Sequence, residues 1–136
     1  MIGTNNPFNI RYSRSNKWLG QTGHRKGFCC FSDLKYGIRA CAVLLKNYYQ
    51  FFHLTTISKM IYRFAPPFEN DTIAYIDFVA KHTKIPENYV IRSDDQFLRV
   101  LIAVSVYEGN PLDRATIYEN LLYVNFNYPR YEEEDD

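Results

Sequence analysis

The chain lacks long apolar segments. No stretch of its 136 residues approaches the roughly 20 consecutive apolar residues that a membrane-spanning helix requires, so we expect no membrane insertion. The first residues, 1–6, also lack the basic flank and the apolar run of a secretory signal. The sequence therefore predicts a product made in the cytoplasm, which would need a partner or cell lysis to leave it.

Cysteine is scarce, and the residue spacings of several catalytic and binding motifs are missing. Cys29, Cys30 and Cys41 form an odd set with an adjacent pair, which is a poor disulfide framework. No Cys or His spacing resembles a zinc site, and there is no phosphate-binding loop, nucleophile–histidine pairing or recognisable nucleic-acid motif. We expect three reduced thiols, two of them buried, with no metal and no cofactor.

Aromatic residues, in contrast, are plentiful. The chain has 12 Tyr and 10 Phe and is 46% hydrophobic, which excludes a disordered protein. These rings suit a groove that binds sugars, and they suit the half-buried faces of ordinary helices equally well. The length predicts one domain, residues 1–126, followed by an acidic and flexible tail, residues 127–136.

Charge is unevenly distributed along the chain. Residues 1–39 contain seven Lys and Arg but one acid, Asp33, whereas the last five residues are all acidic. A basic segment of this kind attracts polyanions, either nucleic acid or anionic wall polymers. It is equally explained as a solvated surface.

From residue 32 onward the apolar positions follow helical spacing, and about five helices are predicted. The fourth is apolar nearly all round, which predicts a central, buried helix. Residues 5–31 predict loops with two short strands, at about 9–12 and 27–31. The fold class is mainly α, with an irregular N-terminal segment that contains at most a small β-hairpin. The predicted helix starts are Ser32 or Asp33, Thr55 or Thr56, Asn70 or Asp71, Ser93 or Asp94, and about residue 112.

Glu108 is the first candidate for chemistry. It ends the predicted buried helix, directly before Gly109-Asn110-Pro111, which is a sharp helix stop. The partial negative charge of a helix C-terminus and apolar neighbours such as Val104 and Tyr107 both favour the protonated carboxyl. Glycosidic cleavage needs such a proton donor at the leaving oxygen. The alternative is an ordinary surface acid at a helix end.

Glu69 is the second candidate acid, in a loop made rigid by Pro66 and Pro67. Close to a helix start its carboxylate would stay ionised, and it could orient a water or stabilise positive charge on a sugar ring. Helix capping alone explains the neighbouring Asn70 and Asp71.

Ordered motifs over about residues 5–120 resemble a protein family found in phages and prophages. Its members show Asn-Asn-Pro-Gly-Asn-Ile-Arg near the start, then Trp-Ala-Pro-Pro-x-Glu-Asn-Asp-Thr and finally His-Glu-Asn-Gly. The chain departs from this pattern at Phe8, Phe64 and Tyr107, which replace Gly, Trp and His. The matching segments are Asn5-Asn6-Pro7-Phe8-Asn9-Ile10-Arg11, Trp18-Leu19-Gly20, Phe31 with Tyr36-Gly37-Ile38-Arg39-Ala40, Phe64 to Thr72, and Tyr107-Glu108-Gly109-Asn110.

Members of that family are commonly labelled virion structural proteins and look like lysozyme-fold muralytic proteins. The resemblance implies a lysozyme-like, phage-derived domain that cuts peptidoglycan glycan as a lysozyme or lytic transglycosylase. The resemblance implies that Glu108 is the general acid and that Glu69 is the second catalytic candidate. The implied substrate-binding residues are Asn5, Asn6, Asn9, Arg11, Trp18, Asn70 and Tyr107.

The same resemblance sets the expected partners and location. These are bacterial peptidoglycan and other virion proteins, with the protein made in the host cytoplasm and acting at the wall or carried in the virion. A non-catalytic virion or wall-binding protein on the same fold is the alternative, and the loss of the His beside Glu108 favours it. Nucleic-acid binding through the basic segment is the weakest of the three interpretations, and we expect no nucleic-acid partner.

Overall fold

The helices begin at side chains that can cap them. The computed structural model describes residues 3–133, and in this part of the chain the five predicted helices are confirmed. Side-chain oxygens accept the first free N–H groups, as is usual at helix N-termini. The helices are α1 (Leu34–Phe51), α2 (Ile57–Phe64), α3 (Thr72–Thr83), α4 (Asp94–Tyr107) and α5 (Arg114–Tyr123). Their caps are Asp33, Thr56, Asp71, Ser93 and Asp113.

The described strands form one antiparallel hairpin, of β1 (Gln21–Arg25) and β2 (Phe28–Phe31). Lys26 and Gly27 connect them with φ angles of 51° and 84°, the left-handed backbone that a two-residue hairpin turn requires. The second predicted strand is confirmed, but the strand predicted at about 9–12 is wrong. That segment runs beside β2 with a single bridge, Arg11 to Phe28, because positive-φ Asn9 interrupts the extended backbone.

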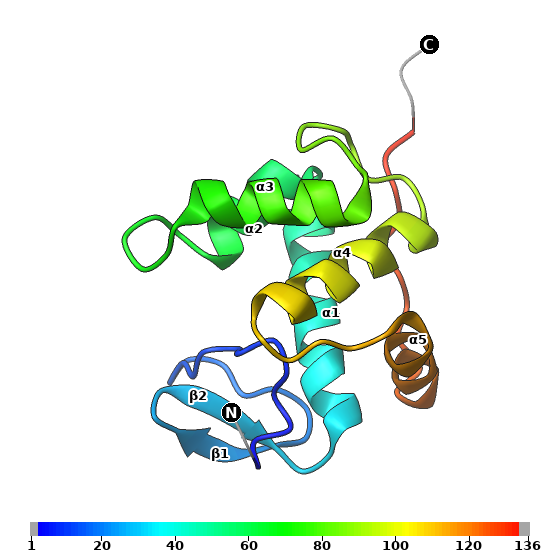
Figure 1. Cartoon of the computed structure of the whole chain (residues 1–136). Coiled ribbons are helices and arrows are strands. Elements are labelled where there is room, and N and C mark those ends of the chain that lie inside the picture. The colour runs from blue at the N-terminus through cyan, green and yellow to red at the C-terminus, as the bar shows by residue number, and fades with distance from the viewer. Residues whose placement is uncertain (1–2, 134–136) are drawn as a thin grey trace.

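α1 connects two parts of the molecule (Figure 1). The N-terminal lobe, residues 3–33 with the hairpin, lies at the start of α1, and α2 and α3 lie at its other end. α4 crosses α1 and packs against α3 and α5. Its residues Phe97, Val100, Leu101, Ala103 and Val104 are fully buried, as expected for a central helix, and they share one core with α1.

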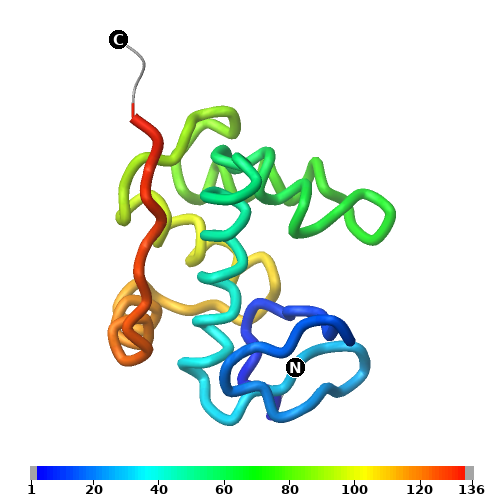
Figure 2. Tube along the Cα trace, turned by 180° about the vertical axis from the view of Figure 1, so that it is seen from behind, coloured from blue at the N-terminus to red at the C-terminus, as the bar shows by residue number. Residues whose placement is uncertain are grey.

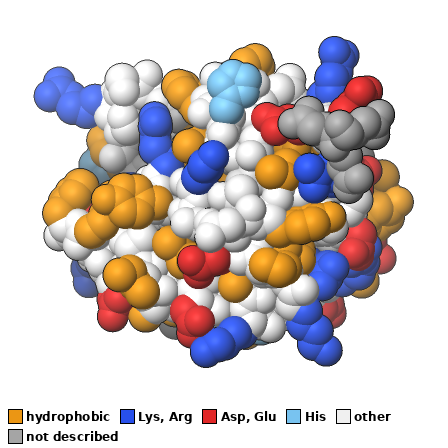
Figure 3. Space-filling model, turned by 90° about the horizontal axis from the view of Figure 1, so that it is seen from above, with side chains coloured by type: hydrophobic (Ala, Val, Ile, Leu, Met, Phe, Trp, Pro, Cys, Tyr) orange, Lys and Arg blue, Asp and Glu red, His pale blue; other side chains and the backbone are white. Residues whose placement is uncertain are grey.

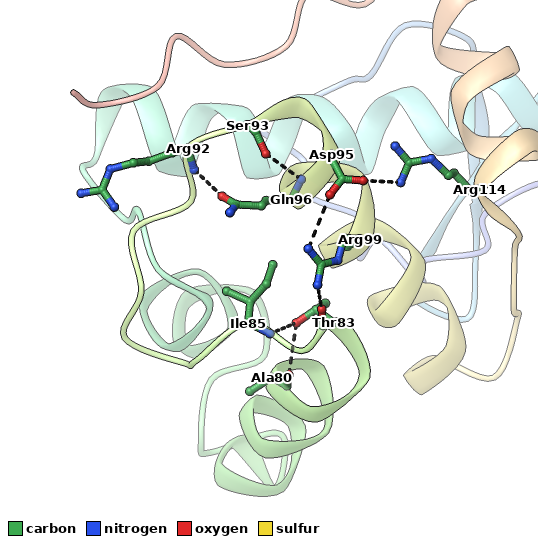
Figure 4. Close-up of polar contacts among 9 residues, drawn as sticks. All are labelled: Ala80, Thr83, Ile85, Arg92, Ser93, Asp95, Gln96, Arg99 and Arg114. Carbon is green, nitrogen blue, oxygen red and sulfur yellow. Dashed lines mark hydrogen bonds and ion pairs between the residues drawn. The ribbon is translucent and has the colours of Figure 1, made fainter. Parts of the chain in front are cut away.

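The start of α4 is tied to both neighbouring helices by polar contacts (Figure 4). Asp95 accepts from Arg99 at 3.4 Å and from Arg114, at the first residue of α5, at 2.7 Å. Arg99 also donates to the backbone carbonyl of Thr83, the last residue of α3. These contacts fix the orientation of α4, and therefore the position of its far end.

Residues 126–133 continue past α5 and run back along α1 (Figure 2). The Tyr131 hydroxyl donates to Asp94 at 2.7 Å, its ring meets that of Tyr49 edge-on, and Tyr128 packs edge-on against Phe97. The sequence assigned this stretch to a flexible tail, but its aromatic rings keep residues 127–133 on the domain. Residues 134–136 of the predicted tail lie outside the described part.

Two of the three thiols are buried, as the sequence predicts. All three cysteines are free, and Cys29 and Cys41 are buried. Seen from the side of α3, exposed hydrophobic side chains lie in separate patches among Lys and Arg (Figure 3). Within residues 3–133, no helix combines the length and apolar character needed to cross a membrane.

Candidate active site

Glu108 is held by the way α4 ends. Its N–H donates to the carbonyl of Val104, and Gly109 follows with a φ of 84°, donating to Val106. A left-handed glycine after the last helical turn is a common way to end a helix. The stop that the sequence predicts therefore fixes the backbone of Glu108, which is half-buried.

The Glu108 carboxylate joins three distant segments. Asn9 Nδ2 donates to Oε1 at 2.8 Å, and the Tyr75 hydroxyl donates to Oε2 at 2.8 Å. Asn9 comes from the N-terminal lobe, and Tyr75 comes from α3. Each carboxylate oxygen of Glu108 thus accepts one hydrogen bond from an oriented donor.

The charge of Glu108 acts on its buried neighbours. Burial, reinforced by the nearby Glu108 carboxylate, raises the pKa of the Tyr75 phenol far above its ordinary value. The same two causes raise the pKa of the Cys41 thiol. Tyr75 therefore stays a hydrogen-bond donor, and Cys41 stays a neutral thiol, throughout the physiological pH range.

Aromatic packing fixes the Tyr75 ring. It stacks on Tyr107 with centroids 3.8 Å apart, and Phe64 meets it edge-on at 6.4 Å. Tyr107, which stands where the resembled family has His, packs on Tyr75, the tyrosine that donates to the Glu108 carboxylate. It is 38% exposed.

The loop at residues 5–11 is built by its asparagines. Asn6 is 3% exposed, donates to the carbonyls of Ile10 and Cys29, and accepts from the Ile10 N–H. Asn5 and Asn9 both have a φ of 53°, a left-handed conformation that Asn tolerates better than most residues. Asn5 and Asn6 thus shape the loop, and Asn9 presents its amide to Glu108.

A cleft of about 380 Å³ lies between the N-terminal lobe and the α2–α3 connection, with α1 contributing to its floor. Its lining combines aromatic rings, side-chain amides and one cation. Glu108 is the sole acid among the described residues that line it. The lining residues are Asn9, Ile10, Arg11, Ser13, Asn16, Trp18, Phe28, Leu44, Tyr48, Phe64, Ala65, Asn70 and Glu108.

The structure brings together five of the nine predicted site residues in this cleft: Asn9, Arg11, Trp18, Asn70 and Glu108. The other four, Asn5, Asn6, Glu69 and Tyr107, do not line it. Glu69 is exposed at the rim, where its Oε2 lies 3.5 Å from Arg11 Nε.

Sequence reasoning missed Tyr75, Tyr48, Asn16 and Phe64 as site residues. Tyr75 lies among the apolar positions of α3, where its ring alone indicates packing. Its hydroxyl was the available signal, because a buried tyrosine needs a hydrogen-bond partner. Among residues 3–133 there is no cluster of three or more His, Cys, Asp or Glu side chains that would hold a metal ion.

Comparison with known proteins relates the chain to a bacteriophage protein. No protein-family model matches the chain. Over 109 residues the chain is 37% identical to Protein P5 of Pseudoalteromonas phage PM2. The match covers 76% of this chain and 66% of that protein, just under two thirds of its length. This chain is therefore similar to a bacteriophage protein over most of its own length.

Proposed function

We propose that this protein is a phage-derived enzyme that cleaves the glycan strands of peptidoglycan, as a lysozyme or a lytic transglycosylase. The observation that carries the proposal is the position of Glu108. It is the one acid among the described residues lining a cleft whose walls are aromatic rings and amides. The similarity to a phage protein supports the phage origin. The phage-family motifs in the sequence support the lysozyme-like interpretation of the fold.

In this mechanism the protonated Glu108 donates its proton to the glycosidic oxygen as the C1–O bond breaks. The hydrogen bonds from Asn9 and Tyr75 then stabilise the carboxylate that is left. That carboxylate next takes a proton from the attacking group, either water in a lysozyme or a hydroxyl of the same sugar in a transglycosylase. Trp18 and Phe64 provide apolar faces for sugar rings.

The cleft supports a mechanism with a single protein carboxylate. Glu69 does not line the cleft and is paired with Arg11 at its rim. Because the described lining holds no second carboxylate, the positive charge that develops on the sugar is balanced by the substrate's own acetamido or hydroxyl group. Such assistance by the substrate is known among glycoside hydrolases. The chemical ends of the released fragments distinguish a lysozyme from a lytic transglycosylase.

A non-catalytic virion or wall-binding protein is the second candidate function. One observation favours it: both oxygens of Glu108 already have protein donors, so the acid also serves to join the N-terminal lobe to α3 and α4. On either proposal the protein is made in the host cytoplasm and acts at the cell wall or in the virion.

The test is turbidity loss of purified peptidoglycan with the wild type and Glu108→Gln, with Lys81→Gln as a control. Lys81 is an exposed cation on α3 that pairs with Asp77. We expect clearing by the wild type and by the control, and none by Glu108→Gln. Mass analysis of the fragments gives anhydro ends for a transglycosylase and reducing ends for a lysozyme. Retained clearing by Glu108→Gln would refute the assignment, and binding to the wall without clearing would favour the second candidate.

A further inference from the structure

Arg11 occupies a prepared position at the cleft. It lines the cleft wall, and its guanidinium lies over the Phe28 ring at 5.3 Å from the centroid. The side chain is nevertheless 59% exposed. A cation held in one orientation by a ring, yet open to the cleft, is suited to binding an anion from outside.

The Arg11–Glu69 ion pair spans the rim of the cleft. Arg11 comes from the N-terminal lobe, and Glu69 comes from the α2–α3 connection, so the pair links the two walls. Arg11 Nε lies 3.5 Å from Glu69 Oε2, longer than an ordinary charged hydrogen bond, and both side chains are more than a third exposed. Exposed pairs of this kind are weak. An incoming anion with better geometry can therefore displace Glu69.

We infer that Arg11 is a specificity-determining residue that binds a carboxylate carried by the glycan, and that Glu69 occupies its place until substrate arrives. This inference rests on the proposed function. Peptidoglycan has such carboxylates on the lactyl groups of muramic sugars that carry no peptide, or on the attached peptides, whereas a neutral N-acetylglucosamine polymer has none. The basic character of residues 1–39 adds to the attraction for an anionic strand.

The inference reverses the role expected for Glu69. If Glu69 were a second catalytic carboxylate, its removal would abolish cleavage. If it competes with the substrate for Arg11, removing its charge improves binding, because the guanidinium no longer has to release a partner. Arg11 and Glu69 substitutions then change affinity in opposite directions.

The experiment measures binding by calorimetry in a Glu108→Gln background, so that no ligand is cleaved. The ligands are neutral chito-oligosaccharides, amidase-stripped glycan strands with free lactyl carboxylates, and strands that keep their peptides. Arg11→Gln and Glu69→Gln are compared with Lys81→Gln, which removes an exposed cation on α3. Thermal melts establish that each variant is folded.

We expect Arg11→Gln to weaken binding of the carboxylate-bearing strands about tenfold and to leave chito-oligosaccharide binding unchanged. Glu69→Gln is expected to strengthen binding of those strands by up to about fivefold, and Lys81→Gln to change nothing. Selective loss with stripped strands assigns the lactyl carboxylate, and selective loss with peptide-bearing strands assigns the peptide. Either result supports the inference.

Three results would overturn it. They are equal loss for neutral and carboxylate ligands in Arg11→Gln, weaker binding in Glu69→Gln, and no binding of any glycan. Failure of the proposed function is separately visible. In that case the protein with Glu108 intact binds the strands, with the same dependence on Arg11, but releases no fragments.

Discussion

Replacing Glu108 by alanine and by glutamine separates its structural role from its chemical one. Alanine removes both hydrogen bonds, and Asn9 Nδ2 and the Tyr75 hydroxyl lose their partner on this side chain. A hydrogen bond to a charged group contributes about 1.5–3 kcal/mol. Because the site is only partly buried, we take the lower bound for each, and expect Glu108→Ala to lower the free energy of unfolding by about 3 kcal/mol.

Glutamine retains the geometry. Its carbonyl oxygen accepts from Asn9, and its amide donates to the Tyr75 oxygen, so we expect a loss below about 1 kcal/mol. Urea unfolding at neutral pH, followed by circular dichroism, measures both variants. The proposed chemistry predicts that both are inactive, although only the alanine variant is clearly destabilised. An alanine variant as stable as the wild type would refute the view that this carboxylate joins the three segments.

Two further predictions concern packing and alkaline pH. An added Cβ at Gly37 in α1 would lie 1.8 Å from the Asn5 backbone oxygen. Gly37→Ala should therefore lower the free energy of unfolding by roughly 1–3 kcal/mol, although alanine favours helix. Gly23→Ala, with open space around its Cβ, is the control, and a stabilised Gly37→Ala in urea unfolding would contradict the prediction. Burial raises the pKa of Tyr48 from 10.0 to about 12, with Arg63 opposing. The folded state therefore holds the Tyr48 proton more tightly than the unfolded chain does. This difference contributes roughly 2–3 kcal/mol to the free energy of unfolding; the contribution is complete below the pKa of the unfolded chain and is lost as the pH rises through the pKa of the folded state. Tyr48→Phe should lose less stability than the wild type over that range, and equal losses in pH-dependent urea unfolding would count against it.

Local signals explain what the sequence predicted well. Asp33, Thr56, Asp71 and Ser93 each precede an apolar repeat, and a cap bonds only to backbone two or three residues away. Glu108 was found for the same reason, because the helix stop beside it is a short-range signal. Features fixed within one turn of the chain can be predicted without knowing the rest of the fold.

Pairings between distant segments were not predictable in the same way. Two segments before β2 could pair with it, residues 9–12 and Gln21–Arg25, and the second contains no apolar residue that would mark it as a strand. The Lys26-Gly27 turn was a local signal for the correct partner. The Tyr75 contact with Glu108 had no spacing rule to reveal it, since the two residues belong to different helices.

The contacts at the cleft also bear on the order of folding. Asn9 and Glu108 are 99 residues apart, and Asn110 donates to the carbonyl of Pro7 across 103 residues. Closing so long a loop costs entropy that local contacts do not repay, so the intervening helices must pack first. The hydrogen bonds of Glu108 therefore form late, after most of the chain has been synthesised and folded. A partner that keeps residues 5–11 away from the end of α4 would dismantle the site without entering the cleft.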